Sequence, residues 1–310
     1  MLSRLSSKAY TPHGISEQRK VRELLKNPLF IFGLIVKVAC IVLFLPTTYT
    51  EWFIPFINNS IDQLTTDPWT SHLINGGNIL SFPYGIIMLV AYLPLSIFAS
   101  SLGNLFGVEN MISIGFGLSS LVFDYGVLIA LALLTKNASN KLLLLLYWCS
   151  PLVIYINYIH GQIDILPIML LLLSICLVYW NRYKSAGLLV ACAVCSKFSM
   201  VIAIPLLLIF IQRKRGFSSE IFQFCSTTAL SLGLLTVPFI GSPGFREMVI
   251  NTRESTRALA LSVPYEEGLN LYVVPIIYLL SLYIVWRLDR ITKDLFILGT
   301  GISFFSLLIF

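Results

Sequence analysis

Residues 157–180 read NYIHGQIDILPIMLLLLSICLVYW and join a polar cluster directly to a long apolar run. The apolar run after the cluster approaches the ~20 residues that a helix needs to cross a bilayer. Just before it stand His160, Gln162 and Asp164. Such groups are costly at membrane depth, and a cluster of them usually serves a substrate or an ion. The stretch therefore predicts a membrane helix that begins at a candidate site.

The composition of the chain indicates an integral membrane protein. Hydrophobic residues make up 57% of the chain and charged residues only 12%, against about 25% charged residues in soluble proteins. Apolar runs near the length of a membrane helix recur along the chain, without the alternation of barrel strands. The predicted fold is therefore all-α, a polytopic transmembrane helical bundle. The net charge of +6 is attributed to cytoplasmic loops, so no nucleic-acid partner is expected.

The domain organisation follows from the same pattern. We expect a basic cytoplasmic N-terminal segment, residues 1–27, and a single transmembrane helical domain, residues 28–310, with outer loops at about 47–110 and 241–269. The last residues stay apolar up to Phe310, which leaves open a truncated C-terminus. The apolar runs lie at 29–46, 83–100, 111–134, 142–158, 163–180, 186–211, 219–240, 270–286 and 294–310.

The orientation of the chain follows from lysine and arginine, which avoid the translocated side of a membrane. Basic residues are frequent before residue 27, whereas 46–83 contains none, so the N-terminus is assigned to the cytoplasm and the first loop to the outer face. The charges of the later loops agree with this orientation only if residues 82–98 lie along the outer surface as an interfacial helix. Their sequence is FPYGIIMLVAYLPLSIF. The compact loops favour a bacterial plasma membrane.

The run 186–211 has basic residues at both ends, so both ends are assigned to the cytoplasm. It must then form a hairpin of two short helices, with CSKFS at its tip and Lys197 near the outer half of the bilayer. Lys197 could bind a phosphate or extend to the lipid headgroups. Lys37 and Asp124 lie within spans, where buried pairing, pore lining and chemistry all remain open.

The predicted outer face also gathers carboxylates and guanidinium groups. Glu51, Asp62 and Asp67 stand in the first outer loop, and Arg253 and Arg257 stand in the second. Carboxylates can remove a proton from a hydroxyl or bind a divalent cation, and arginines can hold a phosphate or pyrophosphate. These are the groups needed to transfer a sugar from a lipid phosphate carrier.

Each candidate also has a structural interpretation. Asp67 could form only a turn with the proline that follows it. Glu51 could lie at the membrane interface next to a tryptophan. The groups of the HGQID cluster could cap helices or connect neighbouring helices by hydrogen bonds.

The segment HGQID, then LPIMLLLLSICLVYW, a short basic turn and AGLLVACAVCSKFSMVIAIPLLLIF resembles the GQxD…AGLL…K pattern of GT-C glycosyltransferases, over about residues 29–211. These enzymes use polyprenyl-phosphate sugars, and the resemblance is of the mannosyltransferase type. It implies a catalytic base in the first outer loop, for which Asp67 is the best match, then Glu51 and Asp62. It also implies that Lys197 lies near the carrier phosphate and that Gln162 and Asp164 shape the sugar pocket.

The same resemblance extends to FPYG, which is similar to the start of the juxtamembrane helix of this superfamily and makes Tyr84 a further candidate for substrate contact. His160 belongs to the same predicted binding region. The first loop lacks an adjacent acidic pair, which departs from many members and leaves dependence on a divalent cation open.

These observations together predict an inverting glycosyltransferase in the lipid bilayer. It would move a sugar from a polyprenyl-phosphate donor to a glycan or glycolipid acceptor at the outer face. Two alternatives remain: a transporter or flippase of lipid-linked saccharides, and a non-catalytic subunit of a glycan-assembly complex.

Overall fold

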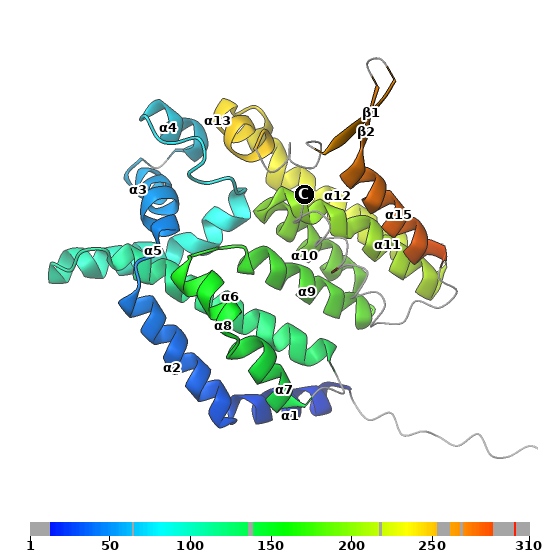
Figure 1. Ribbon diagram of the computed structural model, residues 1–310, viewed down its shortest axis with the longest axis horizontal. Helices are drawn as coiled ribbons and strands as arrows, with labels where there is room; N and C mark the ends of the chain where they lie inside the picture. Colours follow the sequence, from blue (N-terminus) through cyan, green and yellow to red (C-terminus); the bar gives the residue numbers. More distant parts are fainter. Residues whose placement is uncertain are drawn as a thin grey trace, which may run out of the picture.

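The computed structural model describes residues 13–63, 65–135, 139–216, 219–252, 261–266, 269–287 and 301. Helices dominate this part of the chain and pack as a bundle, in agreement with the predicted all-α fold (Figure 1). The helices of the first half are α1 (His13–Leu25), α2 (Pro28–Leu43), α3 (Ile54–Asp62), α4 (Pro68–Ile74), α5 (Ile86–Phe106), α6 (Met111–Leu134), α7 (Asn140–Leu143) and α8 (Pro151–Ile154). The helices of the second half are α9 (Ile165–Tyr179), α10 (Tyr183–Ser196), α11 (Ala203–Arg215), α12 (Ser219–Ile240), α13 (Pro243–Phe245) and α15 (Val273–Arg287).

Shorter elements connect these helices. Single π-helical turns cover Thr48–Phe53, Leu144–Trp148, Tyr155–Ile159 and Arg246–Ile250, and a 3-10 turn covers Phe198–Ile202. Strands β1 (Ser262–Glu266) and β2 (Leu269–Tyr272) pair antiparallel and lead into α15.

Several of the helices have the dimensions of membrane spans. Among the described residues, three helices are long and apolar enough to cross a bilayer, namely α5, α6 and α12. Two bent pairs could each form one more span: Arg19–Leu25 with α2, bent by 59°, and Asn140–Trp148 with Pro151–Ile159, bent by 43°. The chain is thus a multi-pass membrane protein.

Contacts between helix termini define two opposite ends of the bundle. At one, which we call the basic end, Lys20 donates to the carbonyl of Thr135 and Lys214 donates to the side chain of Asn181. At the other, which we call the site end, the N–H of Gly85 donates to the carbonyl of Ser196. Helices α6 and α9 run in parallel from the site end to the basic end.

The parallel course of α6 and α9 follows from two contacts along their length. A Cβ on Gly126 would lie 2.3 Å from the sulfur of Met169, near the middle of α6 and the start of α9. Further along both helices, the thiol of Cys176 lies 3.7 Å from the carbonyl of Ala130.

Helix α5 differs from the predicted interfacial helix 82–98 in its length. It begins at Ile86, continues through Pro94 and ends only at Gly107, whose φ of 66° is the left-handed conformation typical of helix C-termini. Its length and composition are those of a span. However, α5 starts at the site end and α6 finishes at the basic end, so the two helices together take the chain across the bundle once.

The predicted hairpin at 186–211 is confirmed. Helix α10 ends at Ser196, Lys197 is extended (φ −143°, ψ 119°), and α11 starts after one 3-10 turn. Lys214, near the end of α11, lies against Asn181, which precedes the start of α10. The far ends of both short helices therefore lie together at the basic end, and Lys197 lies at the site end.

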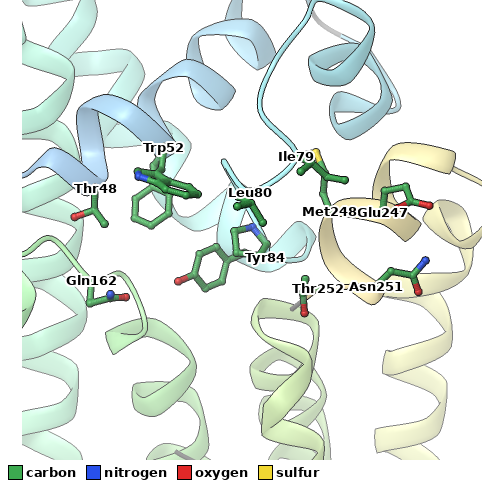
Figure 2. A pocket seen from close by; sticks show the side chains of 12 residues that line it. Thr48, Trp52, Ile79, Leu80, Tyr84, Gln162, Glu247, Met248, Asn251 and Thr252 are labelled. Carbon is green, nitrogen blue, oxygen red and sulfur yellow. The ribbon is translucent and has the colours of Figure 1, made fainter. Parts of the chain in front are cut away.

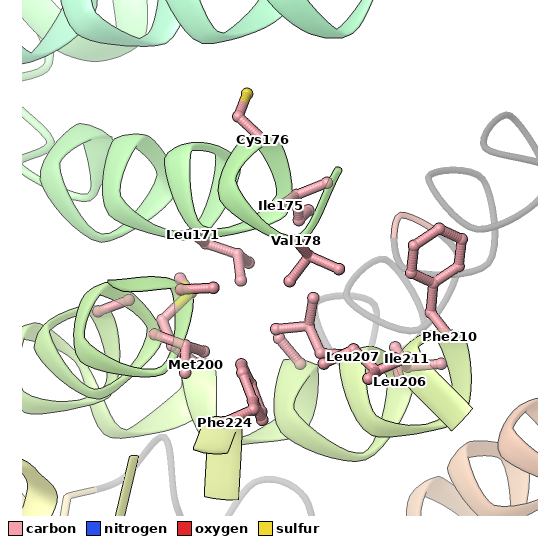
Figure 3. Packing of buried hydrophobic residues seen from close by; sticks show 14 of the residues in the cluster. Leu171, Ile175, Cys176, Val178, Met200, Leu206, Leu207, Phe210, Ile211 and Phe224 are labelled. Carbon is pink, nitrogen blue, oxygen red and sulfur yellow. The ribbon is translucent and has the colours of Figure 1, made fainter. Parts of the chain in front are cut away.

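The AGLLVACAV segment packs α10 against its neighbours. A Cβ on Gly187 would lie only 2.6 Å from the carbonyl oxygen of Phe224, so glycine at this position allows α10 and α12 to approach closely. Small residues bring membrane helices together in this way. Beyond this contact, Leu171, Ile175 and Val178 of α9 face residues of α11 in the largest buried apolar cluster (Figure 3).

A second buried cluster, rich in aromatic rings, lies at the site end. The rings of Phe56 and Phe82 stack with centroids 4.5 Å apart. The indole N–H of Trp69 donates to the carbonyl of Tyr84 at 3.3 Å. The segment that carries Phe56 and Trp69 and the FPYG segment are therefore packed closely against each other at the site end.

A buried ion pair resolves the question left open for Lys37 and Asp124. Both side chains are fully buried, and Lys37 Nζ lies 2.5 Å from Asp124 Oδ2. Tyr147 and Tyr158 also donate to the carboxylate of Asp124, each at 2.6 Å. The Lys37 amine lies 3.6 Å from the ring centroid of Trp148. Buried pairing is thus the arrangement adopted.

Candidate functional site

The HGQID loop is placed by a glycine that no other residue could replace without strain. Gly161 has a φ of 83°, and a Cβ there would lie 2.6 Å from Pro46 and 2.8 Å from the hydroxyl of Thr48. The same hydroxyl donates to the carbonyl of His160. The loop therefore turns sharply against the chain that leaves α2, and its side chains remain at the site end.

A second glycine brings FPYG against the tip of the α10–α11 hairpin. A Cβ on Gly85 would lie only 2.1 Å from the carbonyl oxygen of Cys195, which is too close for any side chain, so this approach of the two backbones requires glycine. The adjacent backbone hydrogen bond, from Gly85 N–H to Ser196, is 3.0 Å long. This contact places Tyr84 next to Lys197, whose amine lies 5.6 Å from the tyrosine ring centroid.

The predicted hairpin lysine and HGQID carboxylate form an ion pair. Lys197 Nζ lies 2.8 Å from Asp164 Oδ2, with 16% of the lysine and 31% of the aspartate side chain exposed. The other oxygen, Asp164 Oδ1, is buried and accepts no hydrogen bond from the described residues. Most of this pair is shielded from water, which strengthens its interaction relative to a surface pair.

A cavity of about 520 Å³ opens beside Tyr84, the ring next to Lys197, and Gln162, two residues before Asp164 (Figure 2). Figure 2 shows Thr48, Trp52 and Gln162 on one side, Tyr84 in the middle, and Glu247 on the opposite side. The remaining lining residues are Phe53, Ile79, Leu80, Pro83, Met248, Asn251 and Thr252. The wall is therefore largely apolar and aromatic, with polar groups at both sides, as is usual for small-molecule sites.

The HGQID side chains lie at different depths around this cavity. Gln162 lines it, and its amide nitrogen lies 3.2 Å from Nε2 of His160. His160 is exposed and lies against the ring of Tyr155, with centroids 6.3 Å apart. Lys197 and Asp164 do not line the cavity themselves. They lie behind its wall, because Lys197 is next to the ring of Tyr84 and Asp164 is two residues after Gln162.

The acidic residues of the first loop lie outside the lining of the cavity. Asp67 caps α4, because its Oδ1 accepts from the N–H of Thr70 at 3.1 Å and from the hydroxyl of Ser242 at 2.8 Å. Glu51 and Asp62 are both exposed. The structure thus brings Tyr84, Gln162, Asp164 and Lys197 together but does not bring these three carboxylates into the same wall.

Glu247 is the carboxylate that sequence reasoning missed. It is exposed and lines the cavity from the π-helical turn Arg246–Ile250 after α13. Its neighbours Met248 and Val249 are buried in the aromatic cluster. In the sequence Glu247 stands directly after Arg246, and nothing there relates position 247 to Tyr84 or Gln162.

Two of the predicted phosphate-binding residues, Arg253 and Arg257, lie outside the described residues. For a divalent cation, the described part of the chain holds no group of three or more His, Cys, Asp or Glu side chains close enough to bind one.

The site thus combines a lysine held by a carboxylate, an aromatic and apolar cavity, and one carboxylate on the opposite rim. Comparisons with protein-family models, curated proteins and solved structures found no match to this chain.

Proposed function

We propose that this protein is a membrane glycosyltransferase that transfers a sugar from a polyprenyl-phosphate donor to a glycan or glycolipid acceptor. The observation that carries the proposal is the cavity beside the Lys197–Asp164 ion pair. Its volume of about 520 Å³ lies within the roughly 300–1,000 Å³ typical of small-molecule sites. It lies at one end of a membrane bundle, where a lipid carrier can bring a sugar headgroup from the bilayer.

The chemistry of the lining supports a phosphate-linked sugar. Lys197 provides a cation for the phosphate, and such charge-assisted hydrogen bonds are stronger than neutral ones. Trp52 and Tyr84 offer aromatic surface to the sugar ring, and Gln162 offers an amide to its hydroxyls. A lipid-anchored donor of this kind needs a groove reached from the bilayer.

The distribution of charge supports the side of the membrane on which this occurs. Lys20, Lys184 and Lys214 lie at or next to the basic end, in agreement with a cytoplasmic location. We therefore assign the site end to the non-cytoplasmic side, with the N-terminus in the cytoplasm.

In the proposed reaction, the acceptor hydroxyl oxygen forms a bond to the anomeric carbon of the donor sugar. The bond between that carbon and the phosphate oxygen breaks, and its electron pair remains on the phosphate. The hydroxyl proton passes to a protein carboxylate, and Lys197 stabilises the departing phosphate. Attack from the face opposite the phosphate inverts the anomeric configuration.

The test uses the purified protein in detergent, with labelled polyprenyl-phosphate mannose as the first donor and a glycolipid extract as acceptor. We expect labelled glycolipid to form without a sealed membrane. Lys197→Met should lower transfer about tenfold to hundredfold, because a hydrogen bond to a charged group contributes about 1.5–3 kcal/mol. Lys141→Met, at an exposed lysine of α7, is the matched control and should retain full activity.

Two results would contradict the proposal. If Lys197→Met and Lys141→Met were equally active, the cavity would not hold the phosphate as proposed. If the protein moved lipid-linked sugars across sealed vesicles but formed no product in detergent, it would be a transporter.

A further inference from the structure

The cavity has polar groups on two separate sides, and the second side has no role in holding the donor. Gln162, two residues before Asp164, lies on one side, and Glu247, Asn251 and Thr252 lie on the other (Figure 2). Among the described lining residues, Glu247 is the one that carries a carboxylate. A donor phosphate near Lys197 would leave this opposite side for the second substrate.

The segment that carries Glu247 is firmly held. Ser242 donates to Asp67 Oδ1 at 2.8 Å and accepts from the N–H of Phe245 at 2.9 Å, which caps α13. The N–H of Gly244 donates to the hydroxyl of Thr70 at 2.9 Å. A Cβ on Gly244 would lie 2.3 Å from the backbone nitrogen of Thr70, so α13 and α4 are in direct backbone contact.

Apolar packing continues this attachment up to position 247. The rings of Trp69 and Phe245 meet edge to face with centroids 4.9 Å apart, and Met248 and Val249 are only 1% and 3% exposed. Glu247 is exposed between these anchored residues. The backbone at position 247 is therefore held in place, while the Glu247 side chain remains accessible to an incoming molecule.

We propose that Glu247 binds the acceptor hydroxyl and accepts its proton during sugar transfer, and that Asp67 is a positioning residue which holds the Glu247 segment through Ser242. This inference rests on the proposed function and names the carboxylate left unassigned there. It gives the acceptor a definite place, at the exposed rim opposite Gln162. The acceptor is accordingly a hydroxyl-bearing molecule that reaches the cavity from the aqueous side.

The proton balance of the step is complete with these groups. The acceptor O–H bond breaks, its proton moves to a Glu247 oxygen, and the acceptor oxygen bonds to the anomeric carbon as the phosphate leaves. The protonated Glu247 then releases its proton to water through the exposed rim. The reaction needs no oxidant or further reactant.

The experiment compares Glu247→Gln with Asp67→Asn in the detergent assay with labelled polyprenyl-phosphate mannose. Glu247→Gln should lower transfer at least about 100-fold, since general base catalysis contributes about 10²–10⁴-fold. It should leave the affinity for the labelled donor and the melting temperature unchanged, because its side chain is exposed and makes no part of the Lys197–Asp164 pair. Asp67→Asn should retain transfer within about threefold, because an amide oxygen can still accept from Thr70 and Ser242.

Asp67→Ala tests the positioning role separately. It removes the acceptor of both hydrogen bonds, so we expect the KM for the acceptor to rise while the donor affinity stays constant. Rescue by asparagine but not by alanine would distinguish positioning from proton transfer. Glu109→Gln, at an exposed glutamate between α5 and α6, is the control and should be fully active.

The outcomes separate the two proposals. Full transfer by Glu247→Gln, or a large loss in Asp67→Asn, would overturn the assignment of Glu247 and leave the transferase proposal standing. Absence of product from the unaltered protein with every polyprenyl-phosphate sugar offered would overturn both.

Discussion

Replacing Asp124 by asparagine should destabilise the bundle strongly, because it removes one charge from a fully buried ion pair. The carboxylate accepts from three donors: Lys37 at 2.5 Å, and Tyr147 and Tyr158 at 2.6 Å each. Lys37 belongs to α2, whereas Tyr147 and Tyr158 belong to the π-helical turns that follow α7 and α8. The pair therefore joins α2 to α6. Asparagine keeps the size of the side chain but leaves the ammonium group of Lys37 uncompensated.

The magnitude follows from complete burial of both partners, each with 0% of its side chain exposed. Breaking a buried pair by removing one partner costs about 3–5 kcal/mol. At roughly 2–4 °C per kcal/mol, the thermal midpoint in detergent should fall by at least about 6 °C. The nearby ring of Trp148 keeps some attraction for the amine but cannot replace a full negative charge.

The double variant, Lys37→Met with Asp124→Asn, separates charge from packing. It removes both charges while the amide still offers hydrogen bonds to Tyr147 and Tyr158, so we expect it to be more stable than Asp124→Asn alone. The measurement is thermal unfolding of Asp124→Asn, Lys37→Met and the double variant in one detergent. If Asp124→Asn melted with the unaltered protein, or if the double variant lost the sum of the two single effects, the pair would not be the buried, coupled unit that the structure indicates.

Three further predictions concern the site end. Gly161→Ala should lower the thermal midpoint more than Gly107→Ala, because both have positive φ but only Gly161 also lacks room for a Cβ; equal effects would contradict this. Burial lowers the pKa of His72 below its usual 6.5, so its neutral form is favoured on folding and stability should be lost as pH falls below about 6.5. His72→Gln should flatten that decline in a series of melting curves, and an unchanged pH dependence would refute it. A cysteine at Asn75 should react with an impermeant thiol reagent on intact cells and one at Ser139 only after permeabilisation, and the reverse pattern would overturn the assigned orientation.

One feature of the helix arrangement, the hairpin at 186–211, could be predicted from charge. Both ends of the run 186–211 carry basic residues, and this alone predicts a hairpin with Lys197 at its tip, as observed. The pattern did not predict the length of α5. A proline at 94 normally weakens a helix, but neighbouring helices in a bundle stabilise the helix around it, and α5 continues to Phe106.

The sequence predicted the parts of the site that lie in motifs where close backbone packing requires a glycine. Gly161 and Gly85 stand in HGQID and FPYG, and each glycine allows a backbone approach that brings the polar side chains of its segment to the site end. The carboxylates had no such signal. The sequence favoured Asp67 over Glu247, whereas in the structure Asp67 accepts from Thr70 and Ser242 as a helix cap and Glu247 lines the cavity.

The most direct test is a structure of the protein with polyprenyl-phosphate mannose bound. The proposal predicts the phosphate in ionic contact with Lys197, the sugar beside Tyr84 and Trp52, and an open path from its anomeric carbon to Glu247. A donor bound at the basic end, or a cavity that stays empty while the donor occupies another surface, would contradict it.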